Sequence, residues 1–304
     1  MFYVCTFIVS FIVLWKAADV FVDASHAIAL HLKLPPILIG ATVVAFGTSA
    51  PELFVTIFAA QAKKSEVVYG SIFGSNIANI FLIFGLSMCL KKIPLNKVFQ
   101  QQLALNISAL LIIGVNITLL QPSRSLGVSC LVVFLLLQYY ILKKNNLQKT
   151  EHPTQSIKTA VALFLSSLLC LIGSSKLLIS SLLKTASFFG VSTTFLSLFG
   201  VAFGTSLPEL VTTLSFVKKN HVSIVVGNVF GSNIFNLLFV LPIAWVVTPV
   251  PFVQHFITEI LILFSVSSVL FIYSNFKKES NHWFGLTFLF IYIIYIGTMY
   301  FFIP

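Results

Sequence analysis

The sequence predicts an all-α membrane protein of ten transmembrane helices, arranged as two five-helix repeats of inverted topology. First, 58% of the 304 residues are hydrophobic and only 9% are charged, whereas a soluble domain carries about 25% charged residues. Second, the apolar residues form ten segments, each long enough to approach the roughly 20 residues that a spanning helix needs. Third, two short motifs occur twice, once in each half of the chain.

The ten apolar segments are separated by short polar gaps rich in lysine, proline and asparagine. In chain order we expect spans near 1–22, 35–60, 67–90, 99–120, 126–142, 157–178, 190–217, 222–247, 252–273 and 283–303. The longest polar stretch, 143–156, is predicted to be a cytoplasmic linker between a first repeat, 1–142, and a second repeat, 157–304. Because the number of spans is even, both ends of the chain are expected on the same side of the membrane.

The net charge of +10 indicates orientation rather than nucleic-acid binding, since the basic residues flank the apolar segments. One set of gaps holds Lys33, Lys91, Lys92, Lys97, Lys143, Lys144, Lys149, Lys158, Lys218, Lys219, Lys277 and Lys278. The other set holds only Lys63, Lys64, Arg124, Lys176 and Lys184. Basic residues concentrate in cytoplasmic loops, so we expect a multi-pass inner-membrane protein with both termini outside the cytoplasm.

Two motifs recur with a constant offset of 157 residues. VAFGTSAPEL at 44–53 returns as VAFGTSLPEL at 201–210, with nine of ten positions identical. FGSNIAN at 73–79 returns as FGSNIFN at 230–236, with six of seven identical. Each half holds five spans, an odd number, so the second half is predicted to enter the membrane upside down relative to the first. Inverted repeats are typical of secondary transporters, whose substrate site lies at the midplane between the repeats.

The first motif places a proline and a glutamate in the middle of an apolar span. Pro51 and Pro208 have no N–H, so each should break its helix and release the carbonyl oxygen four residues before it. Glu52 and Glu209 follow directly, and an ionised carboxylate at the bilayer centre costs at least about 2.5–3.5 kcal/mol, so an acid there indicates function. Helical spacing adds hydroxyl groups to the faces that carry the glutamates, from Thr48, Ser49, Thr205 and Ser206.

The second motif adds a serine and an asparagine four residues apart in each repeat, Ser75 with Asn79 and Ser232 with Asn236. If the four motif helices converge, the site holds carboxylate, amide, hydroxyl and carbonyl oxygens but no Cys, His or Met. Ca²⁺ takes six to eight oxygen ligands, whereas zinc and copper prefer imidazole or thiolate. Two carboxylates balance one Ca²⁺ or two Na⁺, so competition for one set of oxygens is a physical basis for exchange.

Polar residues outside the motifs are expected to have structural roles. Asp19 lies three residues from Lys16, with which we expect it to pair, and Asp23 is expected at the cytoplasmic rim. Glu259 is expected to be a buried, hydrogen-bonded acid, and the six histidines are expected in loops or interfaces. The cysteines have no C-x-x-C spacing and are expected to be packing residues rather than a disulfide or metal site.

In its two motifs the chain resembles the cation/calcium exchanger superfamily, in particular the compact prokaryotic sodium/calcium exchangers. The resemblance covers nearly the whole chain and implies alternating access around a central ion site, with the first and sixth spans as the mobile pair. It implies Glu52 and Glu209 as central Ca²⁺ ligands, with Asn79 and Asn236 at the middle of the site. It implies further oxygens from Thr48, Thr205, Ser49, Ser206, Ser75 and Ser232 and from the carbonyls of Ala45 and Ala202. Some prokaryotic members carry Asp where this chain has Asn236, which takes protonation at that position out of the mechanism here.

The expected function is secondary antiport of Ca²⁺ against Na⁺, by a monomer in the lipid bilayer that needs no cofactor and binds no nucleic acid. A Ca²⁺/H⁺ antiporter of the same superfamily stays open, because two glutamates that face each other in a low dielectric can take up protons. A cation channel is a more distant alternative. An enzyme is not expected, because the motif serines have no mid-span histidine nearby in sequence and GTSxPE is not a nucleophile elbow.

Overall fold

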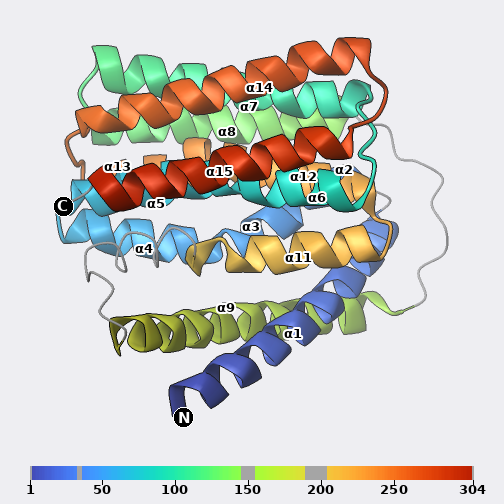
Figure 1. The fold of residues 1–304 in the computed structure, drawn as a ribbon. Coiled ribbons are helices and arrows are strands. Elements are labelled where there is room, and N and C mark those ends of the chain that lie inside the picture. The colour runs from blue at the N-terminus through green and yellow to red at the C-terminus, as the bar shows by residue number, and fades with distance from the viewer. Residues whose placement is uncertain (1, 33–35, 145–154, 189–203, 303–304) are drawn as a thin grey trace.

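The computed structural model describes residues 2–32, 36–144, 155–188 and 204–302, and every regular element in these ranges is a helix (Figure 1). Eight of these helices are long and apolar enough to cross a membrane, and a ninth span is counted when the bent pair Gly40–Thr48 and Ala50–Gln61 is taken together. The predicted seventh span, 190–217, lies partly outside the described residues. An all-helical membrane fold is therefore confirmed, with eight or nine spans in the part of the chain that the structure describes.

The helices follow the predicted apolar segments closely. The first half contains α1 (Phe2–Leu32), α2 (Pro36–Ile39), the π-helix η1 (Gly40–Val44), α3 (Ala45–Thr48), α4 (Ala50–Gln61), α5 (Ser65–Ile77), the π-helix η2 (Ala78–Phe84), α6 (Gly85–Leu90), α7 (Lys97–Leu119) and α8 (Arg124–Lys144). The second half contains α9 (Ile157–Phe188), α11 (Leu207–Lys218), α12 (Val222–Phe235), the π-helix η3 (Asn236–Val240), α13 (Leu241–Val247), the 3₁₀ helix η4 (Gln254–Phe256), α14 (Ile257–Phe276) and α15 (His282–Phe302).

Two helices, α1 and α9, are longer than predicted. The apolar segments suggested ends near residues 22 and 178, whereas the helices continue to Leu32 and Phe188. The added residues are mostly Ala, Leu and Ser, with Asp, His, Lys and Thr among them, and the next helix breakers are Pro35 and Gly190. The helix ends predicted from hydropathy therefore come too early, because residues that are too polar for a membrane span can still continue a helix.

The motif-bearing helices form the centre of the bundle. Figure 1 shows α7, α8 and α14 on one side and α1 and α9 crossing on the other, with α4, α5, α11 and α12 between them. In the two spans that carry the second motif, Ser65–Leu90 and Val222–Val247, 78% and 94% of an 18-residue apolar stretch is buried, against 17–39% of the corresponding stretch in each of the other six unbroken spans. The outer helices expose apolar side chains such as Leu136 and Ile293, as expected where lipid is the solvent.

The predicted helix break at Pro51 is confirmed. The helix ends at Thr48, Ser49 leaves helical geometry with φ −84° and ψ 11°, and α4 then begins with Pro51 in its first turn. The two parts are bent by 53°. In the second half Ser206 has nearly the same geometry, φ −85° and ψ 2°, before α11. The carbonyl oxygen that Pro208 releases, that of Gly204, accepts a hydrogen bond of 3.0 Å from the Ser175 hydroxyl of α9.

The turns after α4 and α11 also repeat in detail. Lys63 and Asn220, 157 residues apart, are the two described non-glycine residues with positive φ, at 55° and 62°. In each turn the next residue donates its N–H to a carbonyl five residues back, Lys64 to Ala59 and His221 to Phe216, both at 2.9 Å. These are left-handed helix caps of the Schellman type, so the two halves share backbone geometry beyond the motifs.

A polar cluster joins α1 to the turn between α11 and α12. The Lys219 ammonium lies 2.6 Å from an Asp23 carboxylate oxygen and donates to the Asp19 carbonyl oxygen at 2.8 Å. The rings of His26 and His221 stack with centroids 4.4 Å apart. Burial and the neighbouring His26 lower the pKa of His221, with Lys219 acting in the same direction and Asp23 opposing. The neutral form of His221 is therefore favoured in this contact.

Close packing at the centre depends on two glycines of η1 and α12. A Cβ added to Gly231 would lie 2.5 Å from the Ala41 Cα, and one added to Gly40 would lie 2.5 Å from the Ile224 carbonyl oxygen. Both neighbours are backbone atoms, so they cannot rotate away. Any larger residue at these positions must separate the helices.

We expect Gly231→Ala to lower the thermal unfolding midpoint in detergent, since overpacking of this kind costs about 1–3 kcal/mol. The matched control is Gly173→Ala on α9, where an added Cβ meets nothing within 4 Å. That change should leave the midpoint equal or higher, because alanine favours a helix over glycine by up to about 1 kcal/mol. An equal response of the two variants would contradict the assignment of Gly231 to a close helix crossing.

Acidification should weaken the α1 contact through His221. A base whose pKa is lowered in the folded state binds more protons when unfolded, so its contribution is present above its ordinary pKa near 6.5 and is lost as pH falls below it. We expect His221→Gln to reduce the drop in thermal midpoint between pH 7.5 and pH 5.5. His282→Gln, in an exposed residue, is the control, and identical pH profiles for wild type and His221→Gln would refute the prediction.

Candidate cation-binding site

The four motif segments meet at the centre of the bundle, from the α3–α4 break, the start of α11, the α5–η2 boundary and the α12–η3 boundary. The predicted site residues there are all buried: Ala45, Thr48, Ser49, Glu52, Ser75, Asn79, Thr205, Ser206, Glu209, Ser232 and Asn236. Ala202, the remaining predicted residue, lies outside the described residues. The structure thus places eleven of the twelve in the buried centre.

Each glutamate accepts a hydrogen bond from a serine of the other repeat. The Ser49 hydroxyl donates to Glu209 Oε1 at 2.8 Å, and the Ser206 hydroxyl donates to Glu52 Oε1 at 3.5 Å. The Ser75 hydroxyl also donates to Glu52 Oε1, at 3.2 Å. Because residue 49 meets residue 209 while residue 52 meets residue 206, the two segments cross in antiparallel fashion about a local two-fold axis.

The asparagines repeat this crossed pattern. Asn79 Nδ2 donates to Asn233 Oδ1 at 2.9 Å, and Asn236 Nδ2 donates to Asn76 Oδ1 at 3.1 Å. Sequence reasoning selected Asn79 and Asn236 but missed Asn76 and Asn233. Both missed residues are fully buried and were visible in the motif as the N of FGSN. Helical spacing from Ser75 indicates Asn79, four residues on and on the same helix face, but not Asn76, which directly follows Ser75 on another face.

Irregular backbone coincides with the two predicted amides. The π-helix η2 begins at Ala78, next to Asn79, and η3 begins at Asn236 itself. A third π-helix, η1, directly precedes Ala45 of the first motif. Single π-helical turns within α-helices occur frequently at functional sites, because they shift a side chain out of the regular helical register.

Several oxygens at this centre are buried and have no hydrogen-bond partner. They include one carboxylate oxygen of each glutamate, Oε2 of Glu52 and of Glu209. They also include the amide oxygens of Asn79 and Asn236 and the hydroxyl oxygen of Ser232. Buried polar atoms are normally paired, so this nearly two-fold symmetric set of unpaired oxygens makes the centre a candidate cation site.

The two motif threonines lie among these side chains. The Thr48 hydroxyl donates to its own helix at the Val44 carbonyl oxygen, 3.1 Å away, and contacts Asn228 Oδ1 at 3.4 Å. The Thr205 hydroxyl lies 3.3 Å from the Ser75 hydroxyl. The Ala45 carbonyl oxygen accepts the Ser49 N–H at 3.0 Å and keeps a second lone pair.

The acids outside the motifs lie apart from this centre. The expected pairing of Asp19 with Lys16 is wrong: its carboxylate accepts the Ser215 hydroxyl at 2.8 Å, and Lys219 holds its carbonyl oxygen. The Asp19 carboxylate thus faces α11 rather than its own helix. Glu259, on α14, is buried with one carboxylate oxygen that has no partner.

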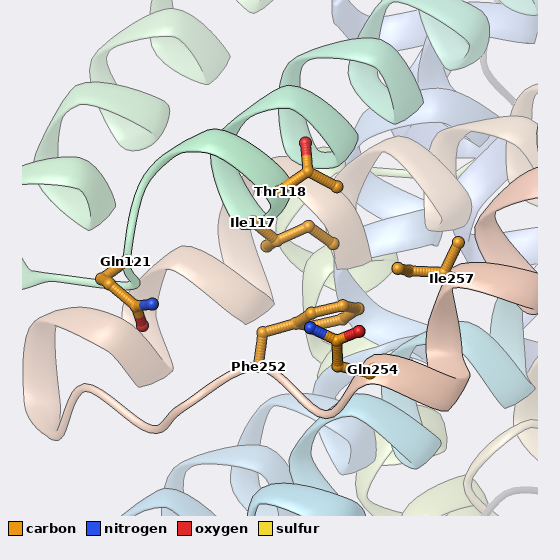
Figure 2. Close-up of a pocket in the computed structure, with 6 residues that line it drawn as sticks. All are labelled: Ile117, Thr118, Gln121, Phe252, Gln254 and Ile257. Atoms are coloured by element: carbon orange, nitrogen blue, oxygen red, sulfur yellow. The ribbon is translucent and has the colours of Figure 1, made fainter.

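A separate cavity of about 250 Å³ lies at the end of α7 (Figure 2). Its lining consists of Ile117, Thr118, Gln121, Phe252, Gln254 and Ile257. None of these residues belongs to either motif or carries a carboxylate, so this cavity lacks the paired carboxylates of the centre. Among the described residues, no cluster of three His, Cys, Asp or Glu side chains is placed to hold a metal.

Known proteins share both the sequence pattern and the fold. The chain is 30% identical to the inner membrane protein YrbG of Escherichia coli over 80% of this chain and 79% of that protein. It is 26% identical to the sodium/calcium exchanger MaX1 of Methanosarcina acetivorans, over 94% of this chain and 95% of that one. Its structure matches that of the sodium-calcium exchanger NCX_Mj soaked with Na⁺ and Sr²⁺, with a TM-score of 0.87, 28% identity and 98% coverage of both chains.

The family model described as "Sodium/calcium exchanger protein" matches residues 2–143 and 159–301, which together are nearly the whole chain. Both pairs of motifs fall within the matched ranges. The chain therefore belongs to the sodium/calcium exchanger protein family.

Proposed function

We propose that the protein exchanges Ca²⁺ for Na⁺ across the membrane by alternating access at the central site. The observation that carries the proposal is the pair of buried glutamates, one from each repeat, each bonded by a serine of the other repeat and each with one carboxylate oxygen that has no partner. Two carboxylates compensate the charge of one Ca²⁺, and neutral oxygens around them suit Na⁺ as the competing ion.

The proposed ligands fall into two groups. Glu52 and Glu209 supply the charge, and Asn79 and Asn236 supply the amide oxygens that the structure leaves without partners. Further positions for Na⁺ come from hydroxyl and carbonyl oxygens of Thr48, Thr205, Ser49, Ser206, Ser75, Ser232, Ala45 and Ala202. Na⁺ is favoured over H⁺ as the driving ion because both middle positions carry a neutral amide, which does not titrate.

Alternating access requires two halves that can exchange roles, and we infer ten spans in two inverted repeats, 1–142 and 157–304, joined by the linker 143–156. The crossed pairing of Ser49 with Glu209 and of Ser206 with Glu52 supports this inference, since it needs antiparallel motif segments. The mobile pair is α1 and α9, which cross each other at the edge of the bundle (Figure 1). One chain supplies both carboxylates, so we propose function as a monomer.

Purified protein in Na⁺-loaded liposomes should take up radioactive Ca²⁺ when diluted into Na⁺-free buffer, and not when Na⁺ is equal on both sides. Glu52→Gln and Glu209→Gln should each reduce initial uptake by at least about tenfold, because Ca²⁺ affinity depends on the number of charged ligands. Glu279→Gln is the control, since Glu279 is exposed and, in the part of the chain that the structure describes, its carboxylate forms a surface ion pair with Lys92 at 3.7 Å.

Each alternative has its own result in the same assay. Uptake that ignores Na⁺ but follows an imposed pH gradient would overturn Na⁺ coupling in favour of a Ca²⁺/H⁺ antiporter. Flux that needs no counter-ion would indicate a channel. Uptake that survives in both glutamine variants would contradict the assignment of the site.

We propose residence in the inner membrane with both termini outside the cytoplasm, because most basic residues fall in the gaps on one side of the predicted spans. In a cysteine-free background, Lys64→Cys should react with a membrane-impermeant maleimide on intact spheroplasts. Lys278→Cys should react only after permeabilisation. Both side chains are exposed at turns between helices, and the opposite labelling pattern would reverse the orientation.

A further inference from the structure

Asn76 and Asn233 form a reciprocal contact between α5 and α12, at the point where the two second motifs cross. Asn76 Nδ2 donates to the Asn233 carbonyl oxygen at 3.3 Å, and Asn233 Nδ2 donates to the Asn76 carbonyl oxygen at 3.3 Å. A backbone carbonyl oxygen can only accept, so these two bonds fix which end of each side-chain amide is the nitrogen.

The orientation of the next pair of amides follows from this. With their nitrogens committed to the backbone, Asn76 and Asn233 present their Oδ1 atoms, which can only accept. They receive Nδ2 of Asn236 at 3.1 Å and Nδ2 of Asn79 at 2.9 Å. The oxygens of Asn79 and Asn236 must therefore point the other way, and both are buried without a partner.

We propose that Asn76 and Asn233 are positioning residues that lock Asn236 and Asn79 with their amide oxygens available to the transported cation, and that this lock sets the affinity for Ca²⁺. The proposal rests on the proposed function, because it concerns the same site. An amide that is free to rotate would present its NH₂ group to a cation for part of the time. Holding the oxygen in place before binding removes that unfavourable orientation.

Each positioning asparagine acts on the amide of the other repeat, so the proposal predicts which pairs of substitutions are coupled. Asn76 acts on Asn236 of the other repeat and not on Asn79, although Asn79 is only three residues away on the same segment. Asn233 acts on Asn79 in the same way. A role limited to helix packing would show no such preference for one partner.

The test is a pair of double-mutant cycles read by equilibrium binding of radioactive Ca²⁺ to the purified full-length protein. Asn76→Leu removes the lock on Asn236 while keeping a side chain of similar size, and should weaken Ca²⁺ binding about tenfold. In an Asn236→Ala background the same change should alter affinity by less than about twofold, because the oriented amide is already gone. In an Asn79→Ala background it should again cost about tenfold.

Asn233→Leu provides an independent cycle with the partners exchanged, and it decides the matter if Asn76→Leu does not yield folded protein. Asn106→Leu is the folding control, because Asn106 is also a buried interhelical asparagine, bonded to Ser267 at 3.0 Å and outside both motifs. It should lower the thermal midpoint without changing Ca²⁺ affinity.

The possible failures are distinct. If wild type binds Ca²⁺ in a Glu52-dependent manner but Asn76→Leu has no effect, or has the same effect in the Asn236→Ala and Asn79→Ala backgrounds, the lock is overturned and the proposed function stands. If wild type itself binds neither Ca²⁺ nor Na⁺, both proposals are overturned.

Discussion

The structure depends on one constraint: two carboxylates from opposite halves of the chain, Glu52 and Glu209, lie close together in a buried core. Isolated charges in such a place are very costly, so every neighbouring group has to compensate them. Part of this compensation comes from the other repeat: the Ser49 hydroxyl donates to Glu209, and the Ser206 hydroxyl donates to Glu52. Neither half can therefore satisfy its own glutamate completely, and the site exists only when both halves are packed together.

The same constraint explains where the backbone is irregular. In a regular helix the carbonyl oxygens are already bonded, and side chains project outwards at fixed angles. The described helices depart from this at the Pro51 break, at Ser206 and at the three π-helices, all of which adjoin the motifs. Meanwhile Gly40 and Gly231 bring the motif helices into backbone contact. The irregular backbone and the close helix packing thus occur together around the buried glutamates. The outer helices remain regular because they have only to face lipid.

Sequence predicted the parts of this arrangement that follow from local rules. The constant offset of 157 residues paired Glu52 with Glu209, and the prolines identified the breaks. What sequence missed depends on contacts between distant segments. Asn76 lies beside Ser75 on α5, and its side chain bonds Asn233 of α12 and Asn236 of η3, contacts that helical spacing within one span cannot indicate. The expected pairing of Asp19 with Lys16 is wrong for the same reason, because its actual partner, Ser215, lies on α11, 196 residues away in the chain.

The nearly identical motifs do not make the two halves equivalent. Asn228 contacts the Thr48 hydroxyl at 3.4 Å and donates to the Thr213 hydroxyl at 2.9 Å, which links three motif segments on one side of the site. At the positions 157 residues earlier the chain has Ser71 and Thr56, and both buried hydroxyls have no partner. A serine has no amide with which to complete the same chain of bonds. If the halves exchange roles, as alternating access requires, the opposite state loses these contacts, each worth about 0.5–1.5 kcal/mol. Under the proposed alternating access, the two states would therefore differ in energy, and the difference would originate in residues next to the motifs rather than in the proposed ligands.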